Sequence, residues 1–226
     1  MEKEEFRLAD ALEAEKVWTY DGVAVLTASV CLPQLPGPLR HSRRFNRYYR
    51  RYCRAFVRYC EQALLPLAQT NYRNTADRSA PWNPLRVSLR YTVSFFSAGV
   101  LSLYTDMREE SGFSQPVTVR RADTWDLSAV LPMPLGEFFP RHCRCRQRLL
   151  DCARTEARRR MERGAAFCPD RRAALRRALN TRNFYLSAEG LRFFYPMYTV
   201  APGSEGIVLF ELPYDDEAGP FLPPRA

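Results

Sequence analysis

The stretch "FYLSAEGLRFFYPMYTVAPGSEGIVLFELPYDD", residues 184–216, decides the fold class of this chain. Its two apolar runs alternate with period two, and turn-forming residues separate them, which is typical of strands in a meander. Gly190 is expected to take the positive φ of a tight hairpin loop, and Pro202-Gly203 the centre of a type II turn. The stretch therefore predicts an antiparallel meander with one face covered by helices.

Strand and helix patterns alternate upstream of this meander. The run "LRVSLRYTVSF" at 85–95 is the clearest strand, because apolar residues alternate with polar ones along it. Residues 42–69 are predicted to form a long helix with Ser42 as N-cap. Its apolar stripe comprises Phe45, Tyr49, Tyr52, Phe56, Cys60, Leu64 and Leu67. Arginine-rich helices are predicted over 141–163 and just after Asp170, and Asp170 is the expected cap of the second of them.

These elements predict an α+β fold, an antiparallel β-sheet with two or three helices packed on it. Residues 1–16 are expected to be an acidic N-terminal tail, and residues 217–226 a loose Pro-rich tail. The sequence between them, 17–216, is expected to be a single domain with sub-halves of about 17–112 and 113–216. Residues 18–32 are expected to form a strand, with Asp21-Gly22 as a turn signal.

The charge of the chain is strongly basic, at +9, and 32 of its 34 basic residues are arginine. No run of about 18 apolar residues predicts a transmembrane helix, and the acidic N-terminus lacks the pattern of a signal peptide. As written, the chain is expected in the cytoplasm, or outside the cell if it is a fragment of a longer membrane-anchored protein. Seven cysteines without a signal peptide favour reduced thiols.

Several segments resemble the RsiV-type domain, the extracellular half of the lysozyme-sensing anti-sigma-V factor. They are "LPQLPG", "FNRYYRRYCRAFVRYCEQALLPLA", "TWDLSAVLPMPLGEFFP" and the C-terminal meander, and together they span roughly residues 17–216. The resemblance implies an α+β fold and a binding rather than a catalytic role, since a similar module precedes a separate catalytic domain in some peptidoglycan deacetylases. Lysozyme is itself basic, so a chain of charge +9 would attract it poorly.

No catalytic, metal or cofactor site is predicted. Zinc usually needs paired Cys-x-x-Cys units, whereas Cys143, Cys145 and Cys152 are spaced differently among arginines. The two histidines, His41 and His142, lie in no recognisable nucleophile motif, and the chain has no Gly-rich phosphate loop. We therefore expect a chain that is not an enzyme; a hydrolase of unknown type is a minor alternative.

The expected function is a sensor or binding module for a protein or a cell-wall-related ligand. The candidate contact residues are Tyr195, Tyr198 and Pro202, because aromatic and proline side chains offer rigid contact area. The alternative is an arginine-rich nucleic-acid-binding protein. Its basic face would consist of Arg43, Arg47, Arg50 and Arg54, with nearby tyrosines available to stack on bases.

Overall fold

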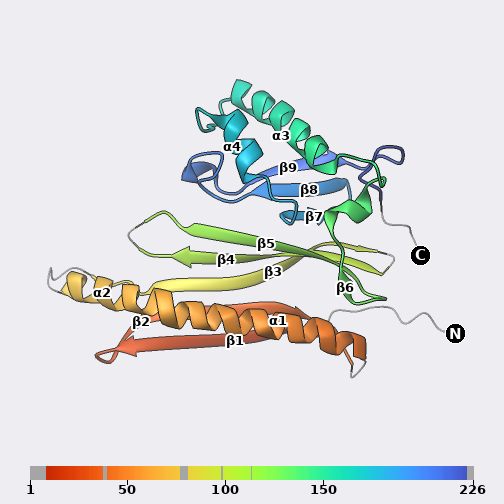
Figure 1. Ribbon diagram of the computed structural model, residues 1–226. Helices are drawn as coiled ribbons and strands as arrows, with labels where there is room; N and C mark the ends of the chain where they lie inside the picture. Colours follow the sequence, from red (N-terminus) through yellow and green to blue (C-terminus); the bar gives the residue numbers. More distant parts are fainter. Residues whose placement is uncertain (1–8, 38–39, 77–80, 98, 113, 223–226) are drawn as a thin grey trace. The chain divides into compact units, whose positions relative to one another are not determined.

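The computed structural model describes residues 9–37, 40–76, 81–97, 99–112 and 114–222 (Figure 1). The first sheet has the strand order β1 (Ala9–Tyr20), β2 (Val23–Gln34), β3 (Leu85–Ser97), β4 (Val100–Glu110), β5 (Val117–Asp126) and β6 (Leu131–Pro132). The second has the order β7 (Phe184–Leu186), β8 (Gly190–Tyr195) and β9 (Val208–Pro213). The helices are α1 (Arg40–Tyr59), which continues through a π-helix (Cys60–Leu64) into α2 (Leu65–Ala76), then α3 (Cys145–Glu162) and α4 (Arg171–Ala178). The predicted α+β class is confirmed.

One strand pair departs from the antiparallel expectation. The pairs β1–β2, β5–β6, β7–β8 and β8–β9 are antiparallel, but β2 and β3 run parallel, with Leu26 opposite Leu85. The helical segment from α1 to α2 lies between β2 and β3 in the sequence, and parallel neighbours need such a long crossover. The turn signal at Asp21-Gly22 is confirmed, with both residues at positive φ, and the turn divides the single strand expected over 18–32 between β1 and β2.

The chain divides into two compact units, and the division falls within β3, β4 and β5. Unit 1 comprises residues 1–91 and 105–118, and unit 2 comprises residues 92–104 and 119–226. The chain therefore passes between the units three times, whereas the sequence suggested one break near residue 112. The predicted outer limits of the domain, 17 and 216, stay a prediction.

In unit 1, α1 packs its apolar stripe against β2. Phe45, Tyr49, Phe56, Cys60 and Leu64 are buried as predicted. Downstream of the π-helix the first buried position is Ala68, while Leu67 is 50% exposed, which corrects the last residue of the predicted stripe. A π-turn holds more residues than an α-turn, so it rotates the following residues around the helix axis.

In unit 2, the C-terminal meander forms the three-stranded sheet, and helices cover one of its faces as predicted. Phe193, Tyr195 and Phe210 are buried there, in one cluster with Leu149 of α3 and Leu175 of α4. The ring centroids of Phe193 and Phe210 lie 5.6 Å apart. The meander therefore supplies most of the apolar layer on which α3 and α4 rest.

The opposite face of this small sheet is also covered, although alternation alone would leave it exposed. Phe194 is 1% exposed and lies beside Tyr185, whose ring contacts Tyr104 with centroids 4.9 Å apart. The Leu186 amide donates to the Ser102 hydroxyl over 2.9 Å, and that hydroxyl lies 2.7 Å from Thr124 Oγ1. Residues of β4 and β5 that belong to unit 2 thus complete its core.

The expected tails are ordered over part of their length. Residues 9–16 belong to β1, an edge strand of the first sheet, and its exposed Glu13 and Glu15 explain the acidic composition, because charges are common on edge strands. At the other end, Gly219 and Pro220 are buried, and the Phe221 amide donates to the Phe138 carbonyl over 2.8 Å. Residues 1–8 and 223–226 lie outside the described part.

Three local predictions about turns and caps are corrected. Gly190 has no positive φ; it is needed because a Cβ there would lie 2.4 Å from the Leu212 carbonyl oxygen. Pro202-Gly203 begins a short 3₁₀-helix (Gly203–Glu205) rather than a type II turn, and Gly206 takes the positive φ. Ser42 lies inside α1, where its hydroxyl donates to the Gly37 carbonyl over 2.7 Å, instead of capping the helix.

Candidate functional site: the arginine face of α1

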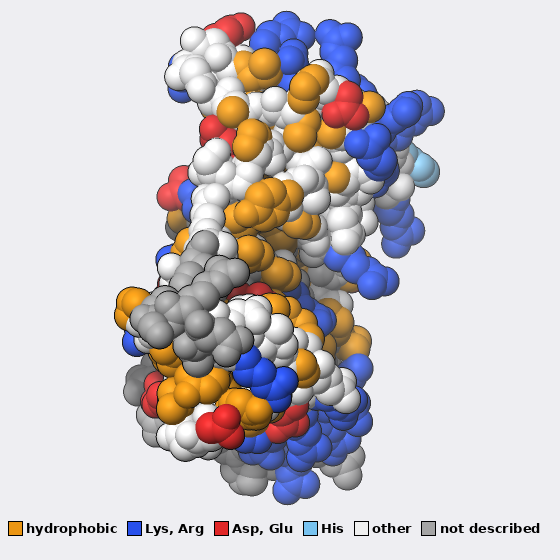
Figure 2. All heavy atoms as spheres, turned by 90° about the vertical axis from the view of Figure 1, so that its left-hand side faces the viewer, with side chains coloured by type: hydrophobic (Ala, Val, Ile, Leu, Met, Phe, Trp, Pro, Cys, Tyr) orange, Lys and Arg blue, Asp and Glu red, His pale blue; other side chains and the backbone are white. Residues whose placement is uncertain are grey.

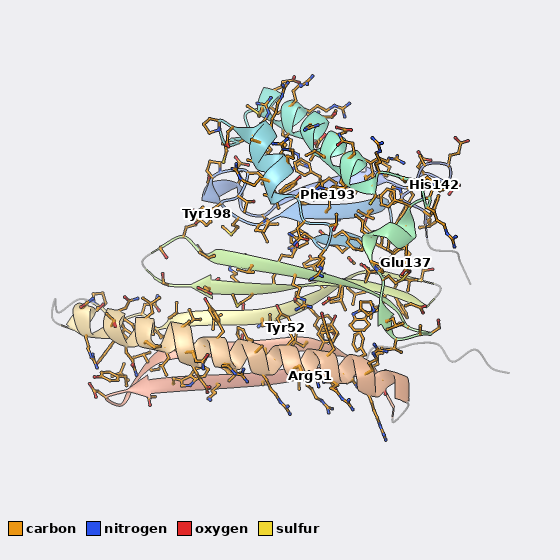
Figure 3. All side chains as sticks on the ribbon, viewed as in Figure 1. Arg51, Tyr52, Glu137, His142, Phe193 and Tyr198 are labelled. Carbon is orange, nitrogen blue, oxygen red and sulfur yellow. The ribbon has the colours of Figure 1, made fainter. Side chains whose placement is uncertain are left out.

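Among the described side chains of α1, seven arginines are exposed, and five of them line one hollow. We call these five the arginine face: Arg43, Arg47, Arg50, Arg51 and Arg54. They recur at steps of three and four residues, so they share one side of the helix, opposite the buried stripe. Figure 3 shows Arg51 and its neighbour Tyr52 on different sides of α1. The face borders a hollow of about 620 Å³, which Gly37, Ser42 and Asn46 also line. The predicted basic face is thus exposed as a continuous surface.

The guanidinium groups of this face have no carboxylate partners among the described residues. The ion pairs of unit 1 lie elsewhere, for example between Lys16 and Glu61 at 2.6 Å. In Figure 2, blue side chains gather at the lower end of the view, where the elements of unit 1 lie. Arginines that share one solvated face repel each other weakly. An anionic partner would relieve this repulsion and would interact favourably with each guanidinium group.

The other polar groups that line the hollow are already engaged within the fold. Asn46 accepts a hydrogen bond from the Leu35 amide over 2.9 Å and donates to the Leu35 carbonyl over 3.0 Å. The Ser42 hydroxyl bonds to Gly37, as described above. The arginine face therefore offers charge and guanidinium forks, and it presents no spare amide of the kind that reads base edges.

The tyrosines of α1 that were expected to stack on bases are directed toward the core. Tyr49 is 0% exposed, and Tyr48 packs against it edge to face, with ring centroids 5.0 Å apart. The Tyr52 hydroxyl accepts a hydrogen bond from Thr105 over 3.5 Å. Stacking platforms for single-stranded nucleic acid are consequently lacking on these three side chains.

The second predicted contact surface is the loop after β8, and the structure exposes only part of it. Tyr195 is 0% exposed, and its hydroxyl donates to the Leu175 carbonyl over 3.1 Å, so it belongs to the core and not to a binding surface. Burial raises the pKa of Tyr195 above its usual value. Tyr198 is 58% exposed and Pro202 is exposed. Only these two of the three loop residues can contact a partner.

Tyr198 is held in an unusual backbone conformation. Its φ of 63° lies in the left-handed region, which is rare for a bulky residue. Gly203 accommodates the ring, since a Cβ at that position would lie 2.2 Å from Tyr198 Cε1. Figure 3 shows Tyr198 projecting from the loop that follows β8. The loop therefore presents one fixed aromatic side chain rather than an aromatic surface.

The residues considered for metal or nucleophilic chemistry form no recognisable site. Among the side chains that the structure describes, no three His, Cys, Asp or Glu residues gather closely enough to hold a metal ion. Burial raises the pKa of the Cys152 thiol to about 11, and this thiol donates to the Glu211 carbonyl over 3.4 Å. His142 is exposed, and the side chain of His41 lies outside the described residues. The absence of metal and of catalysis stays a prediction.

A hollow beside α2 was not anticipated from the sequence. It has a volume of about 500 Å³ and is lined mainly by neutral groups, among them Asn71, Asn74 and Ser111. Its one carboxylate, Glu109, accepts a hydrogen bond from the Tyr59 hydroxyl over 2.8 Å. The lining residues come from three segments, residues 67–75, Leu85 and residues 109–117, so only the folded chain brings them together.

Along the described part of the chain, none of the helices combines the length and apolar character needed to cross a bilayer.

Comparison with known proteins relates this chain to a family without an assigned function. The model of the family described as "Protein of unknown function (DUF3298)" matches residues 141–215, which run from just before α3 to just after β9. No curated protein matches the chain.

Two solved structures of DUF3298 proteins share the fold over nearly the whole chain. The protein from Bacteroides fragilis NCTC 9343 has a TM-score of 0.66 at 15% identity, covering 92% of this chain and 90% of its own. The protein from Pseudomonas aeruginosa PAO1 has a TM-score of 0.57 at 12% identity, covering 93% of this chain and 91% of its own. At these identities the likeness concerns the fold.

Proposed function

We propose that this chain is a non-catalytic binding module whose arginine face on α1 binds an acidic protein surface. The observation that carries the proposal is the set of five exposed arginines without a described carboxylate partner. Arginine suits this role, because its planar fork forms paired hydrogen bonds with a carboxylate.

The dimensions of the face suit an extended partner surface. Arg43 and Arg54 are eleven residues apart, which corresponds to about 16 Å along a helix that rises 1.5 Å per residue. Charges of one sign along such a face accelerate encounter with a partner of the opposite sign, more than they strengthen the final complex. We expect fast, salt-dependent association.

A protein partner is favoured over nucleic acid by what surrounds the arginines. Tyr49 is buried, and the Asn46 amide is occupied by the Leu35 backbone. The resemblance to the RsiV-type domain also supports a protein partner, since that family includes a protein sensor. Lysozyme itself is basic and does not fit an arginine face; a cell-wall polymer with anionic groups is an outcome that the experiment below would detect.

The non-catalytic part of the proposal rests on the state of the reactive groups. The Cys152 thiol is buried with a raised pKa, and the side chain of His142 is exposed. Nothing among the described residues favours the hydrolase alternative.

Site-specific photo-crosslinking in the producing cells tests the proposal. A photoreactive amino acid replaces Arg51 on the arginine face, or exposed Arg86 on β3 as a control position. We expect a protein crosslink at position 51 that is weak or absent at position 86, with Asp- and Glu-rich peptides at the crosslinked site on the partner. Nucleic acid or cell-wall polymer at position 51 would contradict a protein partner.

Matched charge variants then distinguish an effect of the arginine face from an effect of the net charge of the chain. The variant R43Q/R47Q/R54Q removes three arginines of the face, and R86Q/R90Q/R141Q removes three exposed arginines elsewhere. Association of the crosslinked partner at low salt should slow about tenfold in the first variant and change little in the second. Equal slowing in both would remove the arginine face from consideration.

A further inference from the structure

A second group of arginines surrounds a cavity in unit 2, far along the sequence from α1. The cavity has a volume of about 340 Å³. Its lining comprises Arg154 and Arg158 from α3, and Arg171, Arg172 and Leu175 from α4. Figure 2 shows blue side chains gathered around the helices of this unit. Each of the two helices thus contributes two arginines to the lining of this cavity.

The positions of these arginines follow from how α4 is fixed against α3. Arg146, near the start of α3, donates to the carbonyls of Leu179 over 2.8 Å and Arg176 over 3.0 Å, at the end of α4. The buried Tyr195 hydroxyl bonds to the Leu175 carbonyl in the middle of α4. With its end and its middle held, α4 places its first residues beside the later turns of α3. The cavity is therefore built on hydrogen-bonded, packed elements.

The charges around the cavity are not balanced by neighbouring acids. Arg154 forms an ion pair with Asp151 at 3.2 Å. Arg158, Arg171 and Arg172 have no ion pair with a carboxylate in the described part of the chain. Asp170, which immediately precedes α4, pairs with Arg177 at 3.4 Å. A surplus of positive charge therefore remains at the cavity.

One of the arginines that line the cavity also carries a buried donor without a partner. Arg154 Nε is shielded from solvent and has no hydrogen-bond partner among the described atoms. An unpaired buried donor is unfavourable, so an acceptor that reached Arg154 Nε would be stabilising. Together with the facing guanidinium groups, it indicates an oxygen-rich anion.

We infer that this cavity binds a small phosphorylated ligand through its phosphoryl group. A phosphoryl group carries up to two negative charges and three acceptor oxygens, which match several guanidinium forks at once. The volume lies at the small end of ligand pockets, which suits a small molecule or a single headgroup rather than a polymer. Leu175 supplies an apolar contact for the organic part.

This site is independent of the proposed function. It lies in unit 2, on α3 and α4, whereas the arginine face lies on α1 in unit 1. The face is a long open surface on one helix, whereas the cavity takes its arginines from two helices. Either proposal can be refuted while the other stands.

Calorimetric titration of the full chain with glycerol 3-phosphate is the first test. The variant R158Q/R171Q removes one arginine from each wall of the cavity. The control R159Q/R176Q removes one exposed arginine from each of the same helices, outside the cavity lining. We expect the affinity to fall at least tenfold in the first variant and to stay within twofold in the control.

Two further arms identify the source of the phosphoryl group and guard against misfolding. Sedimentation with vesicles containing phosphatidic acid, against phosphatidylcholine alone, reports a lipid headgroup; glycerol 3-phosphate reports a free metabolite. The variant R158K/R171K retains the charge but loses the forks, and its affinity should lie between those of wild type and R158Q/R171Q. Thermal unfolding of each variant confirms that it is folded.

Each result either supports or overturns the inferred phosphoryl site. Cavity-dependent binding of either probe supports the inference, and binding that persists in R43Q/R47Q/R54Q separates it from the arginine face. Equal loss of affinity in R158Q/R171Q and R159Q/R176Q would show adventitious attraction to a basic protein and would overturn the site. Failure of both probes to bind the wild-type chain at low salt would overturn it as well.

Discussion

Replacing Gly190 with alanine is expected to destabilise the three-stranded sheet by about 2 kcal/mol. Gly190 opens β8 opposite Pro213 of β9. A Cβ at this position would lie 2.4 Å from the Leu212 carbonyl oxygen and 3.0 Å from both the Leu212 carbonyl carbon and Pro213 Cα. All three atoms are backbone, so no side-chain rotation can relieve the overlap. The strands must separate by about 1 Å to reach an ordinary contact of 3.4 Å.

The expected cost follows from the hydrogen bonds around Gly190. Its amide donates to the Ser187 hydroxyl over 3.2 Å, and its carbonyl accepts from the Ser187 amide over 2.8 Å. A displacement of about 1 Å would break or stretch roughly two bonds of this region, each with a net value of about 1 kcal/mol. The deeper pair of Phe193 and Phe210 lies three residues further along and should keep its packing.

Urea unfolding followed by circular dichroism measures this change, with Gly136→Ala as the matched control. A Cβ at Gly136 meets no atom within 4 Å, so this substitution should change the free energy of unfolding by less than about 0.5 kcal/mol. Amide hydrogen exchange at Leu191 should also become faster in the Gly190 variant. If Gly190→Ala proves as stable as Gly136→Ala, the close approach of β8 to β9 described above is wrong.

Three further outcomes are expected from single changes. Tyr195→Phe should lower the free energy of unfolding by about 1–3 kcal/mol in a urea titration, because it leaves the buried Leu175 carbonyl without its donor; an unchanged midpoint would refute the bond. Tyr198→Gly should be more stable than Tyr198→Ala by about 1 kcal/mol in thermal unfolding, since both lose the ring but only glycine relieves the left-handed backbone. Burial raises the pKa of Cys60 and Cys152 to about 11 from 9.0, so the folded thiols keep their protons while unfolded thiols lose them. The thiols' contribution to the free energy of unfolding should therefore be fully present below pH 9 and be lost toward pH 11. The decline should be shallower in Cys152→Ala, and a flat profile would contradict burial of the thiols.

The sequence predicts well those elements whose pattern is decided by one buried face. The stripe of α1 is read from three- and four-residue steps, and β3 from strict alternation, because a single apolar layer covers each of them. The C-terminal meander is equally clear from its alternation and turn residues. The arginine-bearing helices that cover the meander could be placed on one face of its sheet for the same reason.

Features that depend on long-range contacts escape such patterns. The parallel pairing of β2 and β3 depends on where a long helical crossover returns, which local periodicity does not specify. The acidic residues before Lys16 suggested a tail because edge strands and solvated tails have similar compositions. Likewise, Gly219 and Pro220 read as a loose end until the fold brings Phe138 beside them.

The candidate sites show the same division. The arginine face is visible in the sequence because it belongs to one helix. Tyr195 was misplaced because an alternating strand does not reveal how deep each residue lies. The cavity between α3 and α4 could not be foreseen, since its lining joins residues 154–158 to residues 171–175 through the bonds of Arg146.

The repeated passage of the chain between its two units limits how evolution could have rearranged it. A gene fragment for residues 141–215 alone would encode α3, α4 and the meander, but it would omit Ser102 and Thr124. The Leu186 amide would lose its acceptor, and the Tyr185 ring would lose its cover from Tyr104. Recombination at the borders of that segment would thus yield an incomplete core, so we expect the whole interleaved chain to be inherited as one piece.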